Sequence, residues 1–259
     1  MKIVLLGYGN VAQQLVRAFL QSEVVEVVQI YNRTPISQPP ISHCTTALSE
    51  LKQADVYIIA LPDDVIGEFS DQLPFENRLV VHTSGSVSME QLLDKNRRGV
   101  FYPLQTFSKE RAIEMQTVPI CLEAEFEKDF EVLKELGGCI SEKIVEINSE
   151  KRRKLHLAAV YVNNFTNHLY RISEEITETE SLDFALLKPL IFETAKKMDT
   201  LTPSEAQTGP AKRKDVKTIE NHLQQLNEVQ ENGSLDPSAA QLYELFTKSI
   251  LNTYHGKKL

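Results

Sequence analysis

Six residues near the start of the chain have the spacing of a phosphate-binding turn. They are Gly7-Tyr8-Gly9-Asn10-Val11-Ala12, which follow an apolar run at residues 2–6 and precede a helical pattern. In such a turn Gly7 permits a tight bend, Gly9 lets the backbone approach phosphates, and Ala12 allows close packing of helix on strand. The free N–H groups at the start of the helix would face the anion. The pattern therefore predicts binding of the pyrophosphate of a dinucleotide.

A second cluster, Asn32-Arg33-Thr34, follows the next expected strand at residues 26–31. An NAD-binding site usually has an acidic residue here to hold the ribose 2′-hydroxyl. Asn32 removes that charge, Arg33 offers a guanidinium suited to phosphate, and Thr34 adds a hydroxyl donor. We therefore expect NADP(H) to bind, with an NAD-binding or unliganded variant of the fold as the alternative. On the plainer interpretation, Arg33 is a solvated loop residue.

Residues 150–177 contain no Gly or Pro and are predicted to form one long helix that begins at an N-cap, Ser149. At 100° per residue, five polar side chains fall within about 40° of one line: Arg152, His156, Asn163, Asn167 and Tyr170. Hydride transfer to a carbonyl or imine needs a proton donor, and the pKa of an unperturbed histidine, about 6.5, suits His156. Asn163 and Asn164 could orient substrate oxygens through their amides. Alternatively, the polar face contacts solvent or a subunit neighbour.

Short apolar runs alternate with helical stretches up to about residue 148. The strand candidates are residues 2–6, 26–31, 56–61, 79–86, 100–102, 118–122 and 143–147. Most inner runs are apolar throughout, which indicates a sheet covered on both faces. Only helical patterns follow, at about 150–177, 184–198, 216–230 and 238–253, with breakers at 202–210 and at Asn232-Gly233. The predicted fold class is α/β: a doubly wound, mostly parallel Rossmann sheet in residues 1–148, then a smaller all-α domain in residues 149–259.

Composition narrows the possible functions. The chain has 259 residues, 42% of them hydrophobic, and a net charge of −8, which allows a proper core and disfavours nucleic-acid and acidic-membrane partners. No run of apolar residues is long enough to cross a bilayer, so we expect a cytoplasmic protein. Cys44, Cys121 and Cys139 share no metal-ligand spacing, so we expect no metal, and the three should be unpaired, buried side chains.

These motifs together resemble a known superfamily. G-x-G-x-x-A, Asn32-Arg33-Thr34, the run at 60–64 and a helical half opening with one long helix resemble the phosphogluconate-dehydrogenase-like superfamily. Pyrroline-carboxylate reductases, deazaflavin-dependent NADP reductases and hydroxyacid dehydrogenases share that plan. The runs at 82–86, 102–107, 156–159 and 209–215 look more closely like its Rossmann-like NADP oxidoreductase branch. The resemblance covers essentially the whole chain.

The resemblance implies where the cofactor lies. The loop with Leu61 and Pro62 and the turn with Ser84 and Gly85 would lie at carboxyl ends of strands and border the nicotinamide half of the cofactor. Ser84 could contact substrate or only stabilise a turn. Asp63 is expected to cap the helix that follows it.

Four further residues are candidates for binding substrate: Gln105, Thr106, Lys212 and Arg213. The last two belong to a loop at 209–215 with a Gly-Pro turn and three cations, which could pair with a carboxylate or phosphate. Alternatively, this is an ordinary solvated loop. The family commonly has glycine at the position of Lys214, so this chain departs from the pattern there.

A second departure concerns the catalytic acid. Hydroxyacid dehydrogenases of this superfamily place a lysine four residues before an asparagine; if Asn164 matches that asparagine, the lysine position is Val160. The sequence predicts an NADP(H)-dependent oxidoreductase acting on a small anionic carbonyl or imine compound, with His156 in place of the lysine. Val160 favours the alternative, an NADP-binding regulatory or scaffold protein.

The long helix offers more apolar surface than one small bundle covers, which predicts a homodimer through the C-terminal helices.

Overall fold

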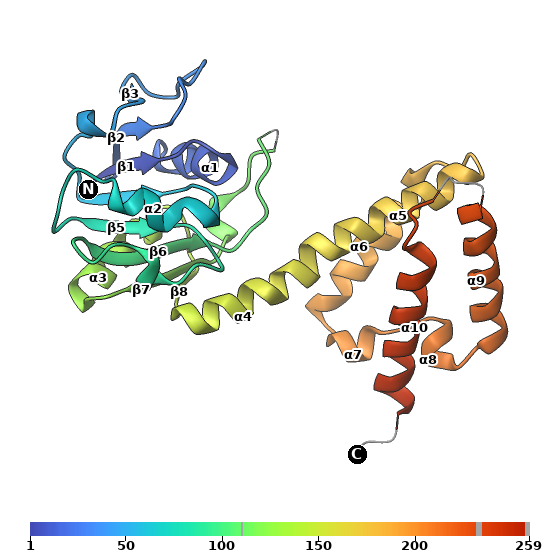
Figure 1. The fold of residues 1–259 in the computed structure, drawn as a ribbon. Coiled ribbons are helices and arrows are strands. Elements are labelled where there is room, and N and C mark those ends of the chain that lie inside the picture. Colours follow the sequence, from blue (N-terminus) through green and yellow to red (C-terminus); the bar gives the residue numbers. More distant parts are fainter. Residues whose placement is uncertain (110, 232–234, 257–259) are drawn as a thin grey trace. The chain divides into compact units, whose positions relative to one another are not determined.

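The computed structural model describes residues 1–109, 111–231 and 235–256. It divides the chain into two compact units, Met1–Asn163 and Asn164–Leu259. Figure 1 shows the sheet in the first unit and the helices of the second. The division falls inside the long helical segment, so residues 149–163 cluster with the sheet. The predicted break at Asn232-Gly233 lies outside the described residues.

The first unit is built on an eight-stranded sheet with strand order β3-β2-β1-β4-β5-β6-β7-β8. Neighbouring strands are parallel except β6 and β7, which pair antiparallel. This confirms the predicted doubly wound, mostly parallel Rossmann sheet. The two-residue strand β3 was not predicted. The strands are β1 (Lys2–Leu6), β2 (Glu26–Tyr31), β3 (Cys44–Thr45), β4 (Val56–Ile59), β5 (Leu79–His82), β6 (Arg97–Pro103), β7 (Ile120–Ala124) and β8 (Ile144–Glu146).

Helices cover both faces of this sheet. Side chains alternate across a strand, so Ile3 and Leu5 of β1 point to one face while Val4 and Leu6 point to the other. The first face packs against α1 (Asn10–Phe19) and α3 (Glu127–Gly138), and the second against α2 (Ile66–Asp71). Both layers are buried, which explains why the inner strands are apolar throughout.

Two strands end earlier than their apolar runs suggest. The strand candidates at 56–61 and 79–86 end at Ile59 and His82. After β5 the chain turns because the Ser84 hydroxyl oxygen accepts the backbone N–H groups of Ser86 (3.1 Å) and Val87 (3.0 Å). Such local hydrogen bonds compete with pairing in a sheet. Both strand ends therefore continue as loops at the carboxyl edge of the sheet, where β1 also ends.

The long helical segment is not one uniform α-helix. It consists of α4 (Ser149–Ala159), a π-helical stretch η5 (Val160–Phe165) and α5 (Thr166–Thr179). Its N-cap is Asn148, whose side-chain oxygen accepts the N–H of Lys151 at 2.9 Å, so the predicted N-cap Ser149 is wrong. A π-helix has more residues per turn than an α-helix. The constant 100° spacing used to predict the polar stripe therefore does not hold through η5.

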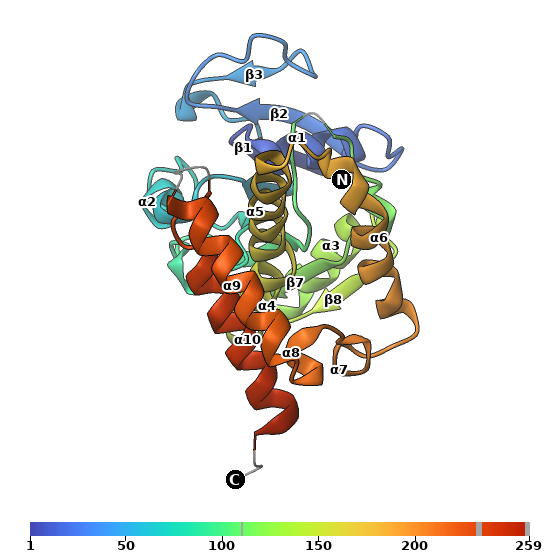
Figure 2. The same cartoon turned by 90° about the vertical axis from the view of Figure 1, so that its right-hand side faces the viewer.

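The second unit contains only helices among its described residues. Its small core consists of Ile172, Leu235 and Ala239 with neighbouring apolar side chains. Figure 2 shows α9 and α10 running side by side, in agreement with their contacts. After α5 the helices are η6 (Phe184–Leu187), α6 (Lys188–Lys196), η7 (Lys197–Asp199), α7 (Pro203–Ala206), α8 (Pro210–Arg213), α9 (Val216–Glu231) and α10 (Ala239–His255). Within the described ranges, no helix combines the length and apolarity needed to cross a membrane.

Candidate functional site

The turn after β1 requires glycine at its first position. Gly7 has φ of +103° and donates its N–H to the Tyr31 carbonyl oxygen at 2.8 Å. A Cβ on Gly7 would lie 2.6 Å from the carbonyl oxygen of Ala60, a contact that the backbone of the neighbouring loop does not allow. Conformation and space therefore both exclude a larger residue.

The N-terminus of α1 has the features of an anion site. Gly9 is its N-cap; no side chain caps the helix, and its first turn has no acidic residue. The N–H groups of the first turn, at Asn10, Val11 and Ala12, lack intrahelical acceptors. A Cβ on Gly9 would meet no atom within 4 Å, so the space beside this backbone is open. Unused donors beside open space fit the pyrophosphate of a dinucleotide.

The other residues of the turn differ in burial and in hydrogen bonding. Ala12 is fully buried, as close packing of helix on strand requires, while Tyr8 and Val11 are half-buried. The exposed Asn10 side chain donates to the carbonyl oxygen of Phe107 at 3.1 Å. This hydrogen bond links the start of α1 to the segment that follows β6.

The loop after β2 leaves its arginine available. The Asn32 amide donates to the backbone oxygen of Thr34 at 2.8 Å and to its hydroxyl at 3.3 Å, which fixes the loop. The Asn32 backbone N–H donates to the carbonyl oxygen of Thr45 in β3. Arg33 is exposed and forms no ion pair with any described residue. Its guanidinium is therefore free to bind a phosphate.

The loop after β4 meets the turn after β5 at the same edge of the sheet. Leu61 and Pro62 lead into a 3₁₀-helix, η2 (Asp63–Val65). The Asp63 carboxylate accepts a hydrogen bond from the Ser86 hydroxyl and does not cap η2, so the predicted capping role is wrong. Ser84 is 6% exposed, and its hydroxyl oxygen accepts two backbone N–H groups. The geometry of Ser84 is therefore that of a turn-stabilising residue.

His82, the last residue of β5, forms a hydrogen bond that stabilises this turn. No role was predicted for it from the sequence. Its Nδ1 accepts the N–H of Ser84 at 3.1 Å, and its side chain is fully buried. Burial, reinforced by the nearby Arg152 charge, lowers the pKa of His82 to about 3. His82 is therefore neutral at physiological pH. Its Nε2 has no hydrogen-bond partner among the described residues.

A tyrosine–histidine pair lies beside the same turn. The hydroxyl of Tyr102, in β6, and Nδ1 of His156, in α4, are 3.0 Å apart, and the rings meet edge to face. A Cβ on Gly85 would lie 2.6 Å from Nδ1 of His156 and 2.8 Å from Cζ of Tyr102. Burial raises the pKa of Tyr102 to about 12. A chemical role was predicted for His156 but not for Tyr102, although Tyr102 lies in the run at 102–107 that carries the family resemblance.

Arg152, the first residue of the predicted polar stripe, is buried in an ion pair within the first unit. It is fully buried and pairs with Glu123 of β7, while donating to the Val87 carbonyl oxygen and to the Ser149 hydroxyl. Glu123 also accepts the backbone N–H and the hydroxyl of Ser149 at 2.9 and 2.7 Å. This network fixes the start of α4 on the sheet and so positions His156 one turn later.

The other candidates lie in looser surroundings. Asn163 is half-buried and Asn164 is exposed, both in η5. Gln105 and Thr106 are exposed, and the Thr106 N–H donates to the Gln105 side chain at 2.9 Å. No hydrogen bond between described residues joins the side chains of Asn163, Gln105 or Thr106 to the cluster around Ser84, and Asn164 belongs to the second unit.

The predicted cationic loop lies in the second unit, where Pro210–Arg213 form the short helix α8 and are not a loop. Gly209 has φ of +104°, and Lys214 has φ of +56°, the left-handed conformation that glycine adopts most easily. The Lys212 ammonium donates to the Gln207 carbonyl oxygen at 2.7 Å and lies 5.0 Å from the ring centre of Tyr254. Arg213 is exposed. Of the two candidate cations, Lys212 is thus engaged within its own unit.

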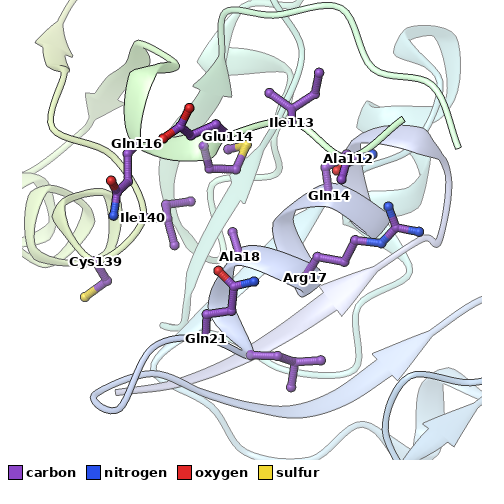
Figure 3. A pocket seen from close by; sticks show the side chains of 12 residues that line it. Gln14, Arg17, Ala18, Gln21, Ala112, Ile113, Glu114, Gln116, Cys139 and Ile140 are labelled. Atoms are coloured by element: carbon purple, nitrogen blue, oxygen red, sulfur yellow. The ribbon is translucent and has the colours of Figure 1, made fainter. Parts of the chain in front are cut away.

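A hollow of about 830 Å³ lies along the flank of α1 (Figure 3). Gln14, Arg17 and Gln21 line it on one side, and the segment at 112–116 with Cys139 and Ile140 on the other. The Gln14 amide already donates to the carbonyl oxygens of Ser108 and Arg111. None of the predicted site residues lines this hollow, so volume alone does not locate the chemistry.

The cysteines only partly match their prediction. Cys121 is buried, but Cys139 is half-buried and Cys44 is exposed, so the prediction that all three are buried is wrong. Cys44 lies in the short strand β3 at the edge of the sheet, where one side has no neighbouring strand. In the described part of the chain, no group of three or more His, Cys, Asp or Glu residues could hold a metal ion.

Comparisons with solved structures agree with this architecture. A "putative NADP oxidoreductase" from Bacteroides fragilis is 38% identical over 97% of this chain and 98% of its own, with a TM-score of 0.85. An imine reductase from Myxococcus stipitatus in complex with NADP+ is 15% identical, covering 99% and 96%, with a TM-score of 0.67. A pyrroline carboxylate reductase from Plasmodium falciparum with NADP bound is 11% identical, covering 97% and 99%, with a TM-score of 0.60. The last two show the fold alone.

These comparisons confirm the predicted resemblance to Rossmann-like NADP oxidoreductases. No curated protein matches the chain. The family described as "Domain of unknown function (DUF2520)" matches residues 118–250, which include β7, the helix with His156 and the cationic loop. Because this match covers more than half of the chain, the chain belongs to the DUF2520 family.

Proposed function

We propose that this protein is an NADP(H)-dependent oxidoreductase that reduces a small anionic carbonyl or imine compound, with His156 as the proton donor. One observation carries the proposal. The His156–Tyr102 pair lies against the turn of Gly85 at the carboxyl edge of the sheet, the edge at which the uncapped start of α1 also lies. Ligands of open α/β sheets bind at this edge, where the strand order reverses. Here that point is between β1 and β4.

The residues of the first unit would hold the cofactor in three places. The N–H groups at the start of α1, with Gly7 and Gly9, would bind the pyrophosphate, and Arg33 with Thr34 would bind the 2′-phosphate. The loop of Leu61 and Pro62 and the turn of Ser84 and Gly85 would border the nicotinamide. When bound, NADPH supplies the hydride.

His156 supplies the proton that the reduction also needs. Hydride addition to carbon leaves negative charge on the carbonyl oxygen or imine nitrogen, and a positioned acid neutralises it as it forms. His156 is held by Tyr102 on one side and by the buried Arg152–Glu123 pair through α4. If Asn164 matches the asparagine of the hydroxyacid dehydrogenases that the sequence resembles, Val160 takes the place of their lysine, and it has no titratable group. We therefore assign the proton to His156, and an orienting role to Asn163 and Asn164.

We further infer that the substrate carries a carboxylate or a phosphate group. Two cations, Lys212 and Arg213, would pair with a carboxylate or phosphate of the substrate, with polar contacts from Gln105 and Thr106. Arg213 is the better candidate because it is exposed, whereas Lys212 already contacts Gln207 and Tyr254. In this proposal residues 1–148 form the cofactor-binding domain and residues 149–259 the helical domain.

The helical domain would also form a homodimer. Large apolar side chains lie exposed on its helices, including Phe192 (71%), Leu186 (68%), Leu245 (64%) and Leu190 (63%). Exposed apolar surface of this kind is typical of an interface. Light scattering coupled to gel filtration should give twice the monomer mass at micromolar concentrations, and the monomer mass would contradict the dimer.

The test of the proposed activity follows NADPH absorbance against a panel of small keto acids, imino acids and acyl phosphates. With a compound that is turned over, His156→Ala should lower turnover by about 10²–10⁴ while leaving NADPH affinity nearly unchanged. His168→Ala, a half-buried histidine of α5, is the matched control and should retain turnover. Turnover that survives His156→Ala would remove the assignment of the acid. A failure of the whole panel, with an effector or protein that binds only in the presence of NADPH, would favour the regulatory alternative.

A further inference from the structure

The pair formed by Tyr102 and His156 determines which nitrogen of the histidine is free for chemistry. The Tyr102 hydroxyl lies 3.0 Å from Nδ1 of His156, and no other described residue hydrogen-bonds to that hydroxyl. Because Nδ1 and Nε2 lie on different edges of the imidazole ring, a partner on Nδ1 leaves Nε2 as the remaining donor or acceptor.

The direction of this hydrogen bond follows from what each group can do. Tyr102 is 8% exposed, and its raised pKa, about 12, keeps the phenol protonated at neutral pH. A buried O–H group without an acceptor loses the hydrogen bond that it would make with water. If Nδ1–H of a neutral His156 donated to the phenol oxygen, the phenol proton would have no acceptor among the described residues. An imidazole nitrogen is also a better acceptor than a phenol oxygen. In the neutral pair the phenol therefore donates to Nδ1.

Gly85 makes this close arrangement possible. Its Cβ position lies 2.6 Å from Nδ1 of His156 and 2.8 Å from Cζ of Tyr102, so both rings pack directly on the glycine backbone. The backbone limits rotation of the imidazole ring away from Tyr102. The turn that carries Gly85 is itself fixed by His82 and by the Ser84 hydroxyl.

We propose that Tyr102 is a positioning residue that occupies Nδ1 of His156 in both protonation states, so that Nε2 is the ring nitrogen that exchanges a proton with substrate. This inference rests on the proposed function. In neutral His156 the Tyr102 O–H donates to Nδ1 and the ring proton is on Nε2. In the imidazolium form Nδ1–H donates to the Tyr102 oxygen, which can accept as well as donate.

The proton transfer requires only His156, Tyr102, the substrate and solvent. The Nε2–H bond of the imidazolium breaks, its electron pair stays on Nε2, and the proton forms a new O–H or N–H bond on the substrate heteroatom. His156 is left in its less stable neutral tautomer, in which the remaining ring proton is on Nδ1 and is donated to the Tyr102 oxygen. Protonation of Nε2 by solvent restores the imidazolium.

Nitrogen-15 NMR of histidine-labelled protein tests the pair in the absence of cofactor and substrate. For the neutral form of His156, the expected spectrum has a protonated Nε2 and an unprotonated, hydrogen-bonded Nδ1, with the signals assigned by their loss in His156→Gln. Tyr102→Phe should remove the hydrogen-bond shift of Nδ1 and populate both neutral tautomers. Tyr57→Phe, which removes another buried hydroxyl that donates to Lys52 at 2.8 Å, should leave the signals unchanged.

A second variant covers the case in which Tyr102→Phe does not fold. Gly85→Ala places a methyl group on the ring of His156 and should cause the same loss of the Nδ1 shift. With a compound that is turned over, Tyr102→Phe should lower kcat by about 10–100-fold and leave KM within about twofold. A proton on Nδ1 in the neutral wild-type protein, or a spectrum unchanged by Tyr102→Phe, would overturn the inference. The expected tautomer in a protein that turns over no substrate would contradict the proposed function alone.

Discussion

The buried histidine that holds the turn of Ser84 should make folding stability depend on pH. His82 is fully buried, and its pKa in the folded protein is about 3, against an ordinary value of 6.5. The unfolded chain therefore takes up a proton near pH 6.5 that the folded protein does not. Stability conferred by a neutral His82 is complete above that pH and is lost as the pH falls toward the folded pKa.

The size of this effect follows from the proton linkage. Between about pH 7.5 and about pH 5, a histidine that titrates at 6.5 only in the unfolded state lowers the free energy of unfolding by about 2 kcal/mol. The figure is insensitive to the folded pKa as long as it stays well below 5. Other groups also titrate in this range, so the measurement needs a variant that lacks only this proton site.

His82→Asn is the matched variant, because the asparagine oxygen takes the place of Nδ1 and can accept the Ser84 N–H. Urea denaturation followed by circular dichroism at the two pH values gives the free energy of unfolding of each protein. The wild-type protein should lose about 2 kcal/mol more than His82→Asn over this interval. Equal losses would show that His82 is not held neutral, and would refute the account of the turn.

Three further substitutions test other parts of the structure. Glu123→Gln leaves the buried Arg152 without its counter-charge and should lower the free energy of unfolding by about 3–5 kcal/mol. Glu131→Gln, which breaks the exposed pair with Lys134, should lower it by less than about 0.5 kcal/mol. Similar urea midpoints for the two variants would contradict this expectation. Lys214→Gly relieves a left-handed residue and should stabilise by about 0.5–1 kcal/mol, while Lys248→Gly inside α10 should cost about 1 kcal/mol. Gly9→Ala enters open space and should leave the melting temperature unchanged. It should weaken NADPH by at least about tenfold in calorimetry, and unchanged affinity would remove Gly9 from the phosphate site.

The structural features that were predicted well depend on residues that lie close together in the chain. The turn from Gly7 to Ala12 depends on residues a few positions apart, the strand before it has the predicted bounds, and a helix follows it as predicted. The continuous apolar runs indicated a sheet covered on both faces, and the two packed layers bear this out.

Long-range contacts determined the parts that the sequence did not predict. Tyr102 and His156 are 54 positions apart, and Glu123 and Arg152 are 29 apart, so no spacing rule connects them. Arg152 looked like part of a polar face because nothing in its own helix shows that β7 supplies a carboxylate. The polar stripe also assumed uniform helix geometry, which the π-helical turns of η5 interrupt.

The most direct test of the central claim is calorimetric titration of the wild-type protein with NADPH and with NADH. We expect the protein to prefer NADPH, since Arg33 forms no ion pair with a described residue and no carboxylate directly follows β2. Arg33→Ala should remove one charged hydrogen-bond partner, worth about 1.5–3 kcal/mol, and so weaken NADPH by roughly ten- to a hundredfold. It should barely change the affinity for NADH. As a control, Arg153→Ala replaces an exposed arginine of α4 and should change neither the NADPH affinity nor the NADH affinity. Equal affinities of the wild-type protein for the two cofactors, or no binding of NADPH, would contradict the account.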